Sequence, residues 1–309
     1  MNGILNVLKP AGMTSFDVIG YMRRITGQRK IGHAGTLDPS AVGVLPLCLG
    51  NATRALEFMI DKDKVYRAEL TLGISTDTQD SSGTVLSFLS VDKTENEIKK
   101  VIADFMGSIE QLPPMYSAIK IGGKKLYELA RQGHTVERES RIIHIFNIDI
   151  IRIWDDNTIF ESEGSTKEFA VKKVLFDVHC SKGTYIRTLC HDIGEKLGCG
   201  GHMSFLVRTR AGQYSLDNAL TMEEILQLSE TKSLEDHLLP VEKIFEEYDI
   251  IKLNKEELFK YNNGVWLEVE KNRYKNSFYR VYDNNSFLGL GEVFEKGNKL
   301  YLKSKKFFK

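Results

Sequence analysis

The residues best suited to chemistry in this chain of 309 residues lie in one short loop, Gly32 to Pro39, which reads G-H-A-G-T-L-D-P. Asp38 is its single carboxylate, and His33 precedes it by five residues. Glycines permit backbone conformations that other residues resist, and Pro39 biases Asp38 towards an extended conformation. A lone positioned carboxylate with no metal-binding motif around it indicates nucleophilic or general-base chemistry. Taken alone, the commoner interpretation of an Asp-Pro pair is a turn cap.

A helix is predicted directly before this loop. Thr14 and Asp17 have the spacing of a capping box, and Gly27 ends the helical pattern. Four cations gather near the end of this helix: Arg23, Arg24, Arg29 and Lys30. They suit either compensation of the helix dipole or contact with phosphates, and the sequence leaves both readings open.

Strict alternation predicts a strand over residues 65–72, with Tyr66 on its apolar face. From this pattern alone a tyrosine of the core is the commoner reading. Asn51 is predicted to cap a short helix. Thr94 begins a second boxed helix, which is expected to end at Gly107.

A basic insert over residues 115–140 follows the pair Pro113-Pro114. Its cations alternate with Tyr116 and Tyr127, a pattern that suits contact with an RNA backbone together with base stacking. A solvated basic loop is the alternative.

A strand over residues 174–180, a turn and a helix form the next unit, with Thr184 as the predicted N-cap. Arg187 falls in the first turn of that helix, where a cation opposes the helix dipole. Arginine in such a position usually has an anionic partner elsewhere. Asp38 is the obvious candidate.

Composition limits the class of protein. Lys plus Arg and Asp plus Glu both number 42, so an RNA-binding face must be a local patch. No secretory signal and no membrane-spanning stretch are recognisable. The four cysteines are best interpreted as reduced thiols in a cytoplasmic protein.

The texture of the sequence changes near residue 245. A short helix is predicted over residues 254–261, followed by strands near 265–269, 278–282, 287–290 and 299–302. Short strands with closely spaced turns indicate a small β-barrel-like domain. We therefore expect an α+β protein with two domains, residues 1–244 and 245–309.

Six motifs in fixed order resemble the TruB-type tRNA pseudouridine synthases of the bacterial stand-alone type. They comprise Lys9 to Ser15, Gly32 to Pro39 with Gly43 to Pro46, Lys64 to Ala68, Pro113 to Lys120, Gly183 to Arg187, and Arg208 to Gly212. The resemblance implies a mixed, largely antiparallel sheet flanked by helices, with a thumb-like insert at residues 115–140. It also implies a PUA-like RNA-binding domain, although the last 60 or so residues match only in length and texture.

The family's site residues carry over by motif. Asp38 is implied to be the nucleophile, Tyr66 to stack on the target base, and Arg187 to pair with the aspartate. His33 is associated with displacing the base. The remaining motif residues expected to bind substrate are Lys9, Lys64, Tyr185 and Arg208. The implied reaction isomerises uridine 55 in the TΨC loop of tRNA without a metal or organic cofactor. The sequence implies a monomer with no protein partner and no contact with membranes.

Three other readings remain. A zinc hydrolase would use Cys199 and His202 with the neighbouring cysteines and histidines, but no second close pair of ligands accompanies them. A non-catalytic RNA-binding protein would not need a positioned acid. A guide-RNA-dependent synthase of the same superfamily is the closest alternative, against which the basic insert and the short C-terminus argue.

Overall fold

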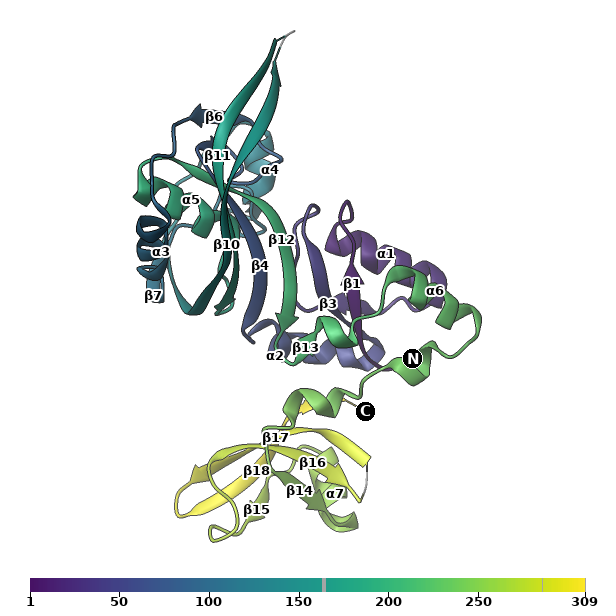
Figure 1. Ribbon diagram of the computed structural model, residues 1–309. Helices are drawn as coiled ribbons and strands as arrows, with labels where there is room; N and C mark the ends of the chain where they lie inside the picture. The colour runs from purple at the N-terminus through teal and green to yellow at the C-terminus, as the bar shows by residue number, and fades with distance from the viewer. Residues whose placement is uncertain (163–164, 285, 309) are drawn as a thin grey trace.

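The computed structural model describes residues 1–162, 165–284 and 286–308. A large sheet with helices against it forms the N-terminal part, and a smaller curled sheet forms the C-terminal part (Figure 1). This arrangement confirms the expected α+β class. The boundary expected at residues 244 and 245 falls inside a short 3-10 helix, η4 (Val241–Phe245), and the division into two domains stays a prediction.

The central sheet is mixed but largely antiparallel, as expected. Its strands are β1 (Gly3–Lys9), β2 (Ile31–His33), β3 (Val42–Leu49), β4 (Lys64–Leu72), β7 (Gly107–Gln111), β10 (Arg141–Ser162), β11 (Ser165–Cys180), β12 (Gly201–Ala211) and β13 (Tyr214–Ser215). The order is β1-β3-β12-β4-β11-β10-β7, with β2 beside β3 and β13 beside β12. The β3–β12 pair is parallel. Two small hairpins pair β5 (Ile74–Thr76) with β6 (Val85–Phe88) and β8 (Lys120–Ile121) with β9 (Lys124–Lys125).

Helices cover both ends of this sheet. They are α1 (Ser15–Thr26), α2 (Leu56–Ile60), α3 (Glu95–Ala103), α4 (Leu126–Arg131), α5 (Ile186–Leu197) and α6 (Met222–Glu230), with 3-10 helices η1 (Gly50–Ala55), η2 (Leu216–Asn218) and η3 (Leu234–His237). Helices α3 and α5 pack against each other, with α3 against β10 and α5 against β12 and β4, whereas α1 packs against β2 and α6 against β1 (Figure 1). Within the described ranges, no helix is long and apolar enough to cross a membrane.

The predicted helix starts are partly right. Thr14 and Thr94 form complete capping boxes, and Gly27 ends α1 in the left-handed region. Two predictions are wrong. Asn51 lies inside η1 and caps nothing, and α3 ends before Gly107, which instead begins β7. Glycine is common where the backbone turns, and Gly107, with φ +93°, lies at the start of the strand that follows the helix.

Strand β4 has the predicted alternation. Tyr66, Ala68 and Leu70 are buried in the main core cluster, which also contains residues of β11 and α5. Leu37 and Ile186 belong to the same cluster, and these are the chain neighbours of Asp38 and Arg187. The core therefore holds the strand with Tyr66, the acid loop and the start of α5 against one another.

The C-terminal part has a hydrophobic core of its own. Its strands are β14 (Ile250–Leu253), β15 (Leu267–Val269), β16 (Ser277–Asp283), β17 (Ser286–Lys296) and β18 (Lys299–Phe307), in the order β14-β16-β17-β18-β15, with α7 (Lys255–Asn262) against them. The helix and four strands match the prediction in place, but β17 and β18 are longer than expected. Strand β14 was not predicted, because four residues contain too little of a period to recognise.

The two parts share an aromatic contact. Phe245 lies with its ring centroid 5.1 Å from that of Phe58 and 5.5 Å from that of Phe308. Lys306 also forms an ion pair with Glu57 at 2.7 Å. The basic, aromatic end of the chain thus packs against the N-terminal part.

Gly43 permits the close approach of β3 and β12. Its φ is +118°, and a Cβ there would lie 2.3 Å from the carbonyl oxygen of Arg208.

We expect Gly43→Ala to lower the free energy of unfolding by about 2 kcal/mol or more, because both backbone strain and a steric clash are introduced. The matched control is Gly20→Ala on α1, where a Cβ meets open space. It should stabilise by up to about 1 kcal/mol. Urea unfolding measures both, and equal effects would contradict the prediction.

Candidate active site

The loop that carries Asp38 is fixed from below by hydrogen bonds to its backbone. Ser15 Oγ accepts from Leu37 N at 2.9 Å and lies 3.3 Å from Leu37 O. Gly12 N donates to Pro39 O at 2.9 Å. The start of α1 therefore holds the two neighbours of Asp38 in the chain.

Arg208 lies under the same loop. Its guanidinium donates to the carbonyl oxygens of Val44 at 2.7 Å, Gly35 at 3.0 Å and Thr36 at 3.4 Å, and the residue is 1 % exposed. Because these contacts use all its nitrogens within the protein, Arg208 supports the loop. Its expected contact with substrate stays a prediction.

Lys9 and Lys64 are buried in the same way. Lys9 Nζ donates to the carbonyls of Met13 at 2.6 Å, Pro10 at 2.8 Å and Pro39 at 3.3 Å. Lys64 Nζ donates to the carbonyls at the end of α2. Burial lowers the pKa of each lysine to about 8. Both lysines thus support irregular backbone from within, and their expected contacts with substrate stay predictions.

Arg187 is also buried, and it contacts Asp38 as the sequence suggested. Nε lies 3.0 Å from one carboxylate oxygen of Asp38, and Nη2 lies 3.3 Å from the other. Nη2 also donates to Tyr116 O at 2.8 Å, and Nη1 to Thr78 O at 3.3 Å. The guanidinium is thereby held in one orientation, with its fork directed at the acid.

The predicted N-cap of α5 is wrong. The N-cap is Tyr185, and no side chain of its own completes the cap. The hydroxyl of Thr184 donates to Ser181 O and so closes the preceding turn. Gln111 at the end of β7 satisfies the backbone of Tyr185 instead.

Sequence reasoning missed a second acid, Asp80. Its carboxylate lies 3.6 Å from Arg187 Nη1, and the residue is 6 % exposed. It accepts hydrogen bonds from the hydroxyl of Thr78 and from the backbone and hydroxyl of Ser82. In the sequence the segment looks like an ordinary polar turn, so only the fold reveals that it reaches Arg187.

The pKa of Asp38 reflects these competing neighbours. Burial raises it above the ordinary value for an aspartate, the Arg187 guanidinium offsets part of the rise, and the Asp80 carboxylate adds to it. The sequence suggested that Arg187 would lower the pKa of Asp38. The lowering is present, but it is smaller than the effect of burial.

Tyr66 and His33 lie on the two strands beside the loop. Tyr66 is 9 % exposed, and burial raises the pKa of its phenol. His33 ends β2, and its Nδ1 is buried without a hydrogen-bond partner in the described part of the chain. Burial lowers the pKa of His33, which favours the neutral imidazole.

Comparisons with known proteins decide the family. Residues 23–186 match the model of the TruB family pseudouridylate synthase N-terminal domain, and residues 187–246 match the tRNA pseudouridylate synthase B C-terminal domain. The chain belongs to the TruB family. It is therefore an enzyme, an isomerase that converts uridine to pseudouridine in tRNA.

Curated relatives agree with this assignment. The tRNA pseudouridine synthase B of Clostridioides difficile is 43 % identical over 100 % of both chains. That of Alkaliphilus oremlandii is 53 % identical over 78 % of this chain and 75 % of its own. Among solved structures, one titled a Cbf5-Nop10-Gar1 complex matches 99 % of this chain and 85 % of its own, at 26 % identity and a TM-score of 0.70.

The TruB assignment leaves the zinc hydrolase without support. Cys180, Cys190 and Cys199 are buried, and all three belong to the core cluster that contains β11 and α5. Across the described ranges, no three His, Cys, Asp or Glu residues are grouped as ligands of a metal ion.

Removing the guanidinium tests how far the two acids depend on it. Arg187→Ala leaves Asp38 and Asp80 together without their shared cation, so we expect a loss of about 3 kcal/mol in the free energy of unfolding near neutral pH. The estimate is at the lower end because the Asp38 side chain is 34 % exposed. The loss should shrink as the pH falls through the raised pKa of Asp38, since a protonated Asp38 no longer needs the cation.

The matched control is Arg67→Ala, which breaks a two-bond ion pair with Asp177 on the sheet surface. That pair is partly exposed, so its removal should cost less than about 1 kcal/mol. Urea unfolding at several pH values measures both variants. A pH-independent loss for Arg187→Ala would show that the two acids do not need the guanidinium.

Proposed function

We propose that this enzyme isomerises uridine 55 in the TΨC loop of tRNA, with Asp38 as the nucleophile. The observation that carries the proposal is the Asp38–Arg187 contact, at 3.0 Å, in a loop fixed on its inner side by buried cations. A carboxylate held in this way is directed at its target without the cost of ordering it during the reaction.

The reaction needs the target nucleotide out of its stack. It breaks the bond from N1 to C1′, rotates the uracil and joins C5 to C1′, while C5 loses a hydrogen and N1 gains one. Flipping costs a few kcal/mol, and stacking on an aromatic ring returns about 1–3 kcal/mol per base. Tyr66 suits this task, although at 9 % exposure it requires the RNA-free arrangement to open.

The other residues take supporting parts in this proposal. Arg187 aims Asp38, and neutral His33, on the strand that leads into the loop, helps to displace the base. Tyr185 lies beside Arg187 at the start of α5. Because no electrons are exchanged with another molecule, the chemistry requires no redox cofactor. We propose that the enzyme acts as a cytoplasmic monomer and needs no guide RNA.

The test is release of tritium from C5 of uridine in a tRNA transcript. Wild type should release the label, and Asp38→Asn should lower the rate by at least about a thousandfold. Asp177→Asn, in the surface ion pair of β11, is the matched control and should keep wild-type activity. A transcript with cytidine at position 55 should release nothing. Release by Asp38→Asn at the wild-type rate would exclude this residue as the nucleophile.

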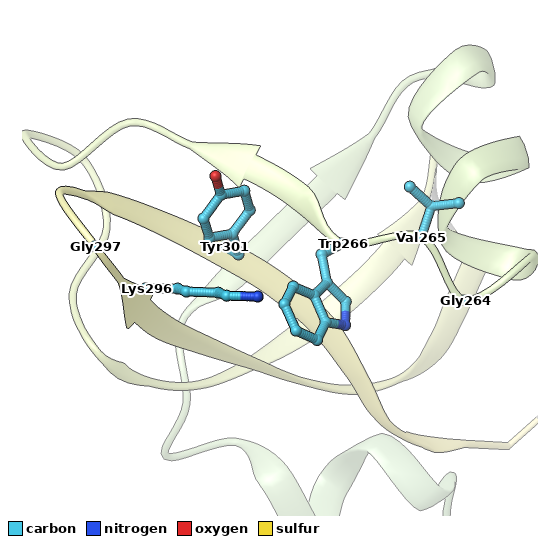
Figure 2. A pocket seen from close by; sticks show the side chains of 6 residues that line it. All are labelled: Gly264, Val265, Trp266, Lys296, Gly297 and Tyr301. Atoms are coloured by element: carbon cyan, nitrogen blue, oxygen red, sulfur yellow. The ribbon is translucent and has the colours of Figure 1, made fainter.

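The C-terminal sheet supports a second contact with RNA. Figure 2 shows Trp266, Lys296 and Tyr301 around an open cavity of about 700 Å³, with the lysine directed at the indole. Lys296 Nζ lies 4.7 Å from the centre of the Trp266 ring, and residue Trp266 is 45 % exposed. An exposed indole beside an ammonium group suits an unpaired base and its phosphate. We propose that this surface is the RNA contact of the PUA-like domain.

This contact predicts a difference between substrates. Trp266→Ala should weaken binding of full-length tRNA by about tenfold, because one stacked base is lost. It should leave binding of an isolated TΨC stem-loop unchanged. Phe259→Ala is the control, since Phe259 is 72 % exposed elsewhere in the same domain. Fluorescence titration measures all the affinities, and an equal loss for both RNAs would refute a separate contact.

A further inference from the structure

The segment that leads into the thumb-like insert is attached to the start of α5. We call residues 111–117 the thumb root. It begins with the last residue of β7 and continues through two buried prolines, Pro113 and Pro114. The basic insert that carries β8, β9 and α4 follows it directly.

Gln111 forms the first attachment. Its side-chain amide donates to Tyr185 O at 3.0 Å, and its side-chain oxygen accepts from Tyr185 N at 2.8 Å. Gln111 is 2 % exposed, so water does not compete for these bonds. Since α5 has no side-chain cap of its own, this amide is what fixes the residue at its start.

Tyr116 forms the second attachment. Its carbonyl oxygen accepts from Arg187 Nη2 at 2.8 Å, the shortest contact that this guanidinium makes in the described part of the chain. The same nitrogen lies 3.3 Å from Asp38. One end of the thumb root therefore holds the backbone two residues before Arg187, and the other end holds its side chain.

The chain between these attachments is stiff. Proline fixes φ, so two in succession leave little freedom to absorb a displacement. Arg138 Nη1 donates to Pro113 O at 2.9 Å, which brings the far end of the insert back to the same prolines. A movement of the insert must therefore reach Tyr185 and Arg187.

We propose that Gln111 is a positioning residue, which couples the thumb-like insert to the Asp38–Arg187 pair through Tyr185. This inference rests on the proposed function and adds a role that the chemistry alone does not require. Gln111 acts on the rate of the isomerisation step, and RNA binding does not depend on it.

The first test separates rate from affinity. Gln111→Ala should lower the single-turnover rate at saturating tRNA by about 10- to 100-fold, since small misplacements of reacting groups have effects of that size. The dissociation constant of tRNA should change by less than about twofold, because binding energy from the basic insert is retained. A loss confined to the dissociation constant would overturn the proposal.

The second test uses Gln111→Glu, which is nearly isosteric. An ionised carboxylate can accept from Tyr185 N but repels Tyr185 O, whereas a protonated one can also donate to that oxygen. Burial raises the pKa of a carboxyl group and nearby guanidiniums lower it, and whatever their balance the introduced carboxyl group gains a proton only as the pH falls. The rate of this variant relative to wild type should therefore rise as the pH falls.

Other charged groups lie near this position. Arg141 pairs with Gln111 across the sheet, and Arg187 lies beyond Tyr185. Asp38 contacts Arg187, and the ratio to the wild-type rate discounts only the pH dependence that the two proteins share. Gln227→Glu on α6, an exposed position, is the matched control and should give a flat ratio.

The outcomes separate this inference from the proposed function. Should Gln111→Ala fail to fold, the comparison of the two Gln→Glu variants decides alone. A flat ratio for Gln111→Glu overturns the positioning role even if Asp38→Asn is inactive. Activity of Asp38→Asn would overturn the nucleophile assignment whatever the Gln111 variants do.

Discussion

The guanidinium of Arg187 is the interaction on which the arrangement of the site depends. A buried arginine has five N–H donors and cannot lose its charge, so it must find acceptors. Here they come from three segments far apart in the chain: the loop with Asp38, the turn with Thr78 and Asp80, and the carbonyl of Tyr116. These segments contain little regular structure at the points of contact. The shared cation gives them a common position that their own backbones do not specify.

A second layer of cations supports the first. Lys9, Lys64 and Arg208 donate to backbone carbonyls, most of them in loops or at the ends of elements. An irregular loop can be buried only if such groups find partners. Burying these charged groups is unfavourable, and in Lys9 and Lys64 it lowers the pKa to about 8. The result is an acid loop with a rigid inner side and an outer side left for the substrate.

The sequence predicted the helices and strands that have local signals, and it missed the residues whose roles depend on contacts with distant parts of the chain. Capping boxes at Thr14 and Thr94 and the alternation around Tyr66 depend on neighbours in the chain, and all three are confirmed. The contact of Arg187 with Asp38 could be anticipated because a cation in the first turn of a helix opposes the helix dipole and therefore needs an anionic partner elsewhere. Asp80 and Gln111 gave no such signal, since their partners lie 107 and 74 residues away. Motif position also could not show that Lys9, Lys64 and Arg208 are buried against backbone carbonyls, because burial depends on the whole fold.

The aromatic contact of Phe245 with Phe58 and Phe308 has a consequence for the binding of RNAs long enough to reach both sheets. Because it fixes the small sheet on the large one, the surface around Trp266 and the loop of Asp38 belong to a single frame. For an RNA bound at one surface, the other surface lies at a fixed distance and in a fixed direction. Its second contact then forms at a high effective concentration without a further loss of rotational freedom. If the contact proposed at Trp266 forms, this frame selects RNAs by their length and bend among stem-loops that present the same uridine.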